Sequence, residues 1–162
     1  MKKKYTSLEA KTKANELFNN KEYKEAKKIL LALLKNGLNE DNLFIMLATI
    51  AKNEENYDLE IDYYKKSLEI SVNEKSFINL TTRLIEEKKF EEAEYYLNHA
   101  KTTFSNSYGV NHNLGRLNFY LNNINEAINY FIKAIKIEPK GIASLLYLGE
   151  IYYIQKKYSK AE

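Results

Sequence analysis

Apolar residues recur along the chain at helical spacing, every three or four positions, with polar residues between them. From Lys21 to Asn36 the apolar positions share one stripe of an α-helix; they are Tyr23, Ala26, Ile29, Leu30, Leu33 and Leu34. The stretch from Ser7 to Asn20 precedes this helix, with Ser7 as the expected N-cap, and Gly37 follows where a left-handed C-cap residue is favoured. The pattern predicts a pair of amphipathic helices that bury one face.

Three columns of equivalent residues recur in one register, with spacings of 33 or 34 residues. A small residue in each expected first helix forms one column: Ala14, Ala48, Thr81, Gly115 and Gly149. The residue twelve positions later in each second helix forms another: Ala26, Glu60, Ala93, Ala127 and Ala161. A large apolar residue three positions before that forms the third: Tyr23, Tyr57, Phe90, Ile124 and Tyr158. The chain therefore reads as repeated helix pairs.

The stretch from residue 108 to 141 gives this spacing a mechanical reason. Two helices approach to about 8–10 Å only where small residues meet, and Gly115 facing Ala127 would supply that contact. Phe131 would then fill the space between the helices, and Ala134 would leave room for the following pair. Pro139 lacks the N–H that would let the second helix continue. We therefore expect each pair to form an antiparallel hairpin.

The order Leu114-Gly115, Ala127, Phe131, Ala134 and Pro139 resembles the tetratricopeptide repeat. The resemblance covers about four and a half repeats, and it implies an all-α fold, an α-α superhelix or solenoid of antiparallel helix hairpins. The expected repeats span residues 7–40, 41–73, 74–107 and 108–141, with a partial repeat at 142–162, in one array over residues 7–162. Residues 1–6 are expected to fray.

Two of the expected repeats depart from the pattern. In the second, Glu60 stands where the family uses Ala, so its side chain must tilt outward or find a partner. The fifth stops at Glu162, one residue past Ala161, and lacks the polar cap that terminal repeats of such arrays normally carry. We expect either an excised piece of a longer array or an exposed face that meets another chain, including self-association through this repeat.

Composition excludes several classes of protein. Cysteine is absent, so disulfides, thiolate metal sites and thiol nucleophiles are excluded. The longest apolar run, Ile142 to Ile154, is short for a membrane span and contains Glu150, which predicts a soluble, cytoplasmic protein. Residues 1–35 hold ten Lys against four Glu, whereas residues 40–98 hold seven basic against fourteen acidic residues. Solvated helix faces explain this distribution, and a basic first hairpin that attracts an acidic segment is the alternative.

The sequence offers no candidate for catalysis. His99 and His112 lie thirteen residues apart, without the close spacing of metal ligands, and no nucleophile elbow or phosphate-binding glycine loop occurs. We therefore expect no enzyme activity, no metal and no cofactor.

In proteins with this repeat, as the resemblance implies, the first helices line a concave groove that holds a peptide or protein segment. The polar and aromatic side chains of such a groove provide backbone hydrogen bonds and a few pockets. The predicted partner-binding residues are Lys11, Asn15, Asn79, His112, Asn113, Arg116, Tyr120, Tyr147 and Glu150.

One subfamily clamps the C-terminal carboxylate of heat-shock chaperones with Lys and Asn side chains and one Arg. Lys11, Asn15 and Lys75 match clamp positions, but Met46 replaces a required Asn and Asn79 stands where the Arg should be. The missing Arg is the only group that gives bidentate carboxylate recognition. The resemblance therefore disfavours the clamp in this chain.

The positions His112, Asn113 and Arg116 allow two interpretations. They form the exposed polar side of an amphipathic helix, or a polar hot spot beside Tyr120 and Tyr147, since Arg and Tyr are favoured where partners dock. In the second case, charge reversal at Arg116 is expected to weaken partner binding without changing the melting temperature.

The leading functional prediction is a non-enzymatic scaffold that binds a peptide or protein in its concave groove. A docking or regulatory module of a larger enzyme or complex is an alternative. An RNA-binding helical repeat of the pentatricopeptide type is disfavoured, because its period is 35 and the middle of this chain is acidic. The sequence does not identify the partner.

Overall fold

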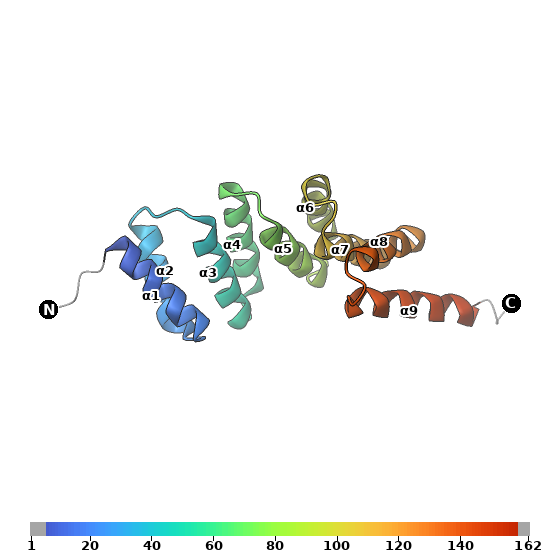
Figure 1. The fold of residues 1–162 in the computed structure, drawn as a ribbon, viewed down its shortest axis with the longest axis horizontal. Helices are drawn as coiled ribbons and strands as arrows, with labels where there is room; N and C mark the ends of the chain where they lie inside the picture. Colours follow the sequence, from blue (N-terminus) through green and yellow to red (C-terminus); the bar gives the residue numbers. More distant parts are fainter. Residues whose placement is uncertain (1–5, 159–162) are drawn as a thin grey trace. The chain divides into compact units, whose positions relative to one another are not determined.

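A computed structural model describes residues 6–158, with side chains as far as Lys156. Within these residues the chain forms nine helices and no strand (Figure 1). They are α1 (Ser7–Asn19), α2 (Tyr23–Lys35), α3 (Asp41–Asn53), α4 (Tyr57–Ile70), α5 (Glu74–Glu86), α6 (Phe90–Thr103), α7 (Tyr108–Tyr120), α8 (Ile124–Ile137) and α9 (Ile142–Tyr158). The column residue Ala161 and the side chain of Tyr158 lie outside the described residues.

The helices follow the register of the sequence columns. Helices α1, α3, α5, α7 and α9 begin at the first residues of the five expected repeats. Each of the helices α2, α4, α6 and α8 begins at the large apolar residue of the third column. The chain divides into two compact units, unit 1 ending at Ser76 and unit 2 beginning at Phe77. The single array over residues 7–162 therefore stays a prediction.

Unit 1 contains the hairpins α1–α2 and α3–α4. Ala14, Ala26 and Ala48 are fully buried, as small residues at helix contacts should be. Glu60 is also buried, with 2% of its surface exposed, and its side chain takes part in an interaction. The carboxylate therefore does not tilt outward. It has an interaction partner inside the protein, which was the other expected arrangement.

In unit 2 the hairpin α7–α8 closes around Phe131. This side chain is fully buried, and a Cβ atom added to Gly115 would lie 2.6 Å from its ring. The nearest atoms to Gly115 thus belong to Phe131, the residue predicted to fill the space between the helices. Helix α9 packs against α8 and α7 (Figure 1), with Leu148 and Ile151 buried beside Ala127 and Phe131.

The turn inside each described hairpin repeats one backbone feature that the sequence columns did not show. Lys21, Glu55, Lys88 and Asn122 all have positive φ, between 56° and 63°. At the third turn the N–H of Lys89 donates to the carbonyl of Leu84 (2.8 Å), and the N–H of Lys88 donates to that of Ile85 (3.1 Å). This is the Schellman arrangement, built here without glycine.

One of the two expected helix caps, Gly37, is present, and Ser107 forms a further N-cap at α7. Ser107 accepts from the N–H of Val110 at 3.1 Å, and Gly37 after α2 has a φ of 87°. The prediction for α1 was wrong by one residue, because Thr6 is the N-cap instead of Ser7. Thr6 closes a capping box with Glu9, whose carboxylate accepts from the Thr6 N–H at 2.8 Å. Residues 1–5 lie outside the described residues.

Over residues 6–158, none of the helices has both the length and the hydropathy needed to cross a bilayer.

Candidate functional site

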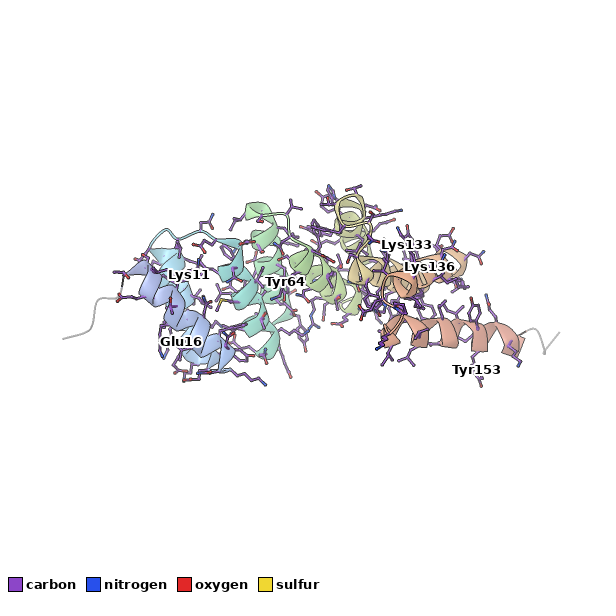
Figure 2. All side chains as sticks on the ribbon, viewed as in Figure 1. Lys11, Glu16, Tyr64, Lys133, Lys136 and Tyr153 are labelled. Carbon is purple, nitrogen blue, oxygen red and sulfur yellow. The ribbon has the colours of Figure 1, made fainter. Side chains whose placement is uncertain are left out.

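The structure divides the nine predicted partner-binding residues between the two units. Lys11 and Asn15 lie on α1 in unit 1, and Figure 2 shows Lys11 on that helix. The seven in unit 2 lie on α5, α7 and α9: Asn79, His112, Asn113, Arg116, Tyr120, Tyr147 and Glu150. Four of these, His112, Arg116, Tyr120 and Tyr147, contact one another in a chain of ring contacts and hydrogen bonds described below.

On α1, the side chain of Lys11 forms an ion pair with Glu40, which precedes α3. Asn15 is half-buried. Met46, which stands at a clamp position, is buried with 5% of its surface exposed. Its thioether is therefore part of the core of unit 1, so this clamp position presents no side chain to a carboxylate. Asn79 on α5 is half-buried.

Asn113 holds α7 against α5. Its surface is 1% exposed, and its amide nitrogen donates to the carbonyl of Ile78 (3.0 Å) and to the hydroxyls of Thr81 and Thr82 (2.9 Å each). A side chain with its donors engaged inside the protein offers nothing to a partner. We therefore leave Asn113 out of the partner surface proposed below.

His112 lies in an aromatic cluster between α7, α8 and α9. Its ring stacks on Tyr108, with centroids 5.7 Å apart, and also contacts Phe131 and Tyr147. Its Nδ1 atom lies 2.8 Å from the hydroxyl of Ser144. Burial, and secondarily the nearby Arg116 guanidinium, lower the pKa of His112 to about 4. The imidazole is therefore neutral at pH 7.

This lowered pKa predicts a pH dependence of stability. Between about pH 6.5 and pH 4 the unfolded chain gains a proton on His112 that the folded chain does not accept, so the free energy of unfolding falls as the pH falls. After allowing for partial exposure, we expect His112 to contribute roughly 2 kcal/mol to this fall. Urea unfolding at several pH values measures it.

The His112→Gln variant is expected to show a shallower fall over the same pH range. The exposed His99 on α6 provides a matched control for a histidine-to-glutamine change outside this aromatic cluster. Equal slopes for the wild type and His112→Gln would contradict a neutral, buried imidazole.

Arg116 joins three first helices of unit 2. Its guanidinium lies 3.9 Å from the carboxylate of Glu86 on α5 and close to the hydroxyl of Tyr147 on α9. Glu86 also pairs with Arg83 at 2.9 Å. The Tyr147 hydroxyl lies 3.5 Å from that of Tyr120. Burial and the hydrogen bond with Tyr120 raise the pKa of Tyr147, and the Arg116 charge opposes that rise.

The expectation of an exposed Arg116 was wrong. Only 12% of its side-chain surface is exposed, because α5 and α9 cover it on both sides. Charge reversal at Arg116 would place a carboxylate beside Glu86 and remove the positive charge near Tyr147. We therefore expect such a variant to lower the melting temperature as well, so it cannot isolate an effect on partner binding.

Four residues form an accessible surface over this network, and we call them the α7–α9 surface: Tyr120, Leu146, Tyr147 and Glu150. Tyr120 is 50% exposed and Leu146 is 67% exposed. Glu150 is exposed and Tyr147 is half-buried. Tyr153, one turn beyond Glu150, is 70% exposed and projects from α9 away from α8 (Figure 2). The surface thus combines two tyrosines held by hydrogen bonds, one leucine and one carboxylate.

The sequence reasoning missed Ser144, which joins α9 to α7. Its hydroxyl contacts His112 and lies 3.3 Å from that of Tyr108, and its surface is fully buried. The repeat pattern gave no signal for it, because the equivalent positions in the other first helices include both polar and apolar residues: Glu9, Leu43, Ser76 and Val110.

Within the part of the chain that the structure describes, no group of three or more His, Asp and Glu side chains could hold a metal ion.

Comparison with protein families gives one relevant match. A family model described as Tetratricopeptide repeat matches residues 42–72 and 108–140. The search of curated proteins found no significant match to the chain.

Solved structures resemble the chain over most of its length. One is YrrB, described as a TPR protein with an unusual peptide-binding site, at 23% identity and a TM-score of 0.77, covering 89% of this chain and 75% of that one. MamA from Desulfovibrio magneticus RS-1 is 15% identical with a TM-score of 0.82, covering 96% and 88%. PilF of Pseudomonas aeruginosa is 21% identical with a TM-score of 0.78, covering 94% and 70%. These likenesses confirm the predicted fold class, an all-α helical repeat of the superhelix type.

Proposed function

We propose that this chain, which belongs to the tetratricopeptide repeat family over residues 42–72 and 108–140, is a non-enzymatic scaffold that binds a peptide or protein segment. The observation that carries the proposal is the α7–α9 surface. Exposed Leu146 and Tyr120 lie there beside Tyr147, whose hydroxyl is 3.5 Å from that of Tyr120. The segment would lie across the first helices of unit 2.

The side chains of the α7–α9 surface are of types that favour binding of a protein partner. Tyrosine provides a large contact area with a polar end, and residues of this type dominate binding at interfaces. The hydrogen bond between the hydroxyls of Tyr120 and Tyr147 and the packing of Tyr147 against Phe119 and Phe131 restrict the rings before a partner arrives, which lowers the entropy cost of binding. The likeness to YrrB, a protein described as having a peptide-binding site, also supports this choice of ligand.

The test begins with peptides selected from a display library against the whole chain. Their affinities for the wild type and for the Leu146→Ser variant are then compared by titration calorimetry. Because Leu146 is 67% exposed, we expect the variant to keep its melting temperature. Loss of an interface side chain of this kind is expected to cost about 1–2 kcal/mol, or roughly tenfold in Kd.

Leu31 on α2 provides a matched control, since it is an exposed leucine on a second helix, at 42%. The Leu31→Ser variant is expected to bind the selected peptides like the wild type. Selected peptides that bind Leu146→Ser and wild type equally would show that the α7–α9 surface is not the binding site.

Self-association is a second candidate, favoured by another face of α9. Ile142 is 69% exposed, Leu145 46% and Tyr152 50%, and a Cβ atom added to Gly149 would meet nothing within 4 Å. An apolar helix face of this kind commonly marks an interaction site. We expect sedimentation equilibrium to show a dimer that the Tyr152→Lys variant weakens. A strict monomer at high concentration would exclude this candidate.

A further inference from the structure

Because the hairpins repeat, a contact between two of them can be compared with its equivalent 34 residues later. Phe90 begins α6 and Tyr120 ends α7, and their rings stack with centroids 6.0 Å apart and planes 16° apart. The equivalent residues one repeat later are Ile124, which begins α8, and Ile154 in α9. Two branched aliphatic side chains thus replace a stacked aromatic pair.

A pocket lies at this second junction. Its volume is about 300 Å³, and its lining residues are Phe119, Asn122, Ile124, Ile151, Ile154 and Gln155. Ile151 is buried, with 1% of its surface exposed, whereas Ile154 is 38% exposed. The position that rings occupy between α6 and α7 is therefore hollow between α8 and α9, and it opens to solvent.

The lining determines what kind of group fits. Among the residues whose side chains the structure describes, the lining includes no charged group, so a neutral, apolar group suits it best. Asn122 and Gln155 are exposed at the pocket, and their carboxamides can donate to and accept from a peptide backbone. The ring of Phe119 provides an aromatic wall, against which another ring packs favourably edge-to-face or offset.

The pocket is continuous with the proposed partner surface. Phe119 lines it and also contacts Tyr147, with ring centroids 5.4 Å apart. A segment bound on the α7–α9 surface could therefore place one side chain in the pocket. We propose that the pocket receives an aromatic side chain of a bound protein segment, in place of the stacked ring found one repeat earlier. This inference rests on the proposed function for its partner.

A minimal probe tests the pocket without any peptide. N-acetyl-L-tryptophanamide carries the aromatic side chain and two backbone-like amides, and N-acetyl-L-leucinamide carries an aliphatic side chain instead. With isoleucine δ1 methyl groups labelled, NMR titration of the whole chain should show saturable shifts for Ile124, Ile151 and Ile154 with the tryptophan derivative. A Kd on the order of 1 mM is expected for a ligand of this size. Ile61 in unit 1 provides an internal control that should not shift.

Replacing a lining residue by a larger side chain that fills the pocket should abolish binding of the probe. The Ile154→Tyr variant restores the ring that Tyr120 supplies one repeat earlier, and we expect at least a tenfold weaker Kd with an unchanged or higher melting temperature. The Ile124→Phe variant closes the pocket from the other side and serves if the first variant does not fold. The Leu31→Ser variant, far along the sequence on α2, is expected to bind the probe like the wild type.

Three results would overturn the inference: no saturable shift in the wild type, equal affinity for the leucine derivative, or undiminished binding by both filled variants. The two proposals can fail separately. Loss of the probe shifts would leave the peptide experiment at Leu146 untouched, and selected peptides that ignore Leu146 would leave the probe experiment untouched.

Discussion

Replacing Phe131 by alanine is expected to lower the free energy of unfolding of unit 2 by about 3–5 kcal/mol. The side chain is fully buried, and its ring stacks on Tyr147 with centroids 5.0 Å apart and contacts His112 at 5.8 Å. Removing the ring leaves a cavity where α7, α8 and α9 meet, and both rings that remain lose a packing partner. Urea unfolding followed by near-ultraviolet circular dichroism measures the change.

The neighbouring residue Ile132 provides the control. It lies on the same helix but is 37% exposed, so the Ile132→Ala variant is expected to cost less than about 1.5 kcal/mol. A loss below about 1 kcal/mol for Phe131→Ala would contradict its place at the centre of this packing.

Gly115→Ala and Gly149→Ala are expected to change stability in opposite directions, although both glycines hold the same position in their first helices. At Gly115 the new methyl group would lie 2.6 Å from the Phe131 ring, and such overpacking costs about 1–3 kcal/mol. At Gly149 a Cβ atom would meet nothing within 4 Å. There, alanine should stabilise α9 by up to about 1 kcal/mol, because it is the better helix former.

Thermal and urea unfolding of the two variants beside the wild type give the comparison. Helix propensity alone would make both variants more stable, so the difference between them isolates the contact with Phe131. A Gly115→Ala variant as stable as Gly149→Ala would mean that α8 does not approach α7 as closely as the structure shows.

The helix pattern could be predicted from sequence because burial repeats in columns. Ala14, Ala48 and Ala93 belong to two such columns, and each is fully buried. The starts of α2, α4, α6 and α8 coincide with the third column for the same reason. A position that every hairpin uses in the same way stands out even where single residues, such as Glu60, depart from the family pattern.

Backbone conformation at the turns could not be predicted in this way. Lys21, Glu55 and Lys88 adopt positive φ without the glycine or asparagine that usually announces it. The hydrogen bonds of the Schellman arrangement and the hairpin contact impose that conformation, and these are tertiary effects. These positive-φ positions can be recognised as a fourth set of equivalent residues only once the structure shows which residue follows each first helix.

The proximity of some candidate residues could be predicted from sequence, whereas their part in binding stays a prediction. His112, Arg116 and Tyr120 share one face of α7, and the next first helix, α9, places Tyr147 beside that face. Their exposure was not predictable, because it depends on which side chains the flanking helices supply. Arg116 is covered through its contacts with Glu86 and Tyr147, and neither residue is near it in sequence.

The central claim is that the small residue Gly115 in the first helix and the large ring of Phe131 from the second helix hold the hairpin α7–α8 together. A double-mutant cycle between Gly115→Ala and Phe131→Leu tests it most directly, with the free energy of unfolding measured for all four proteins. We predict that Gly115→Ala destabilises the wild type but is neutral or stabilising in the Phe131→Leu background, where the smaller side chain leaves room for the methyl group. The same loss of stability in both backgrounds would contradict the claim.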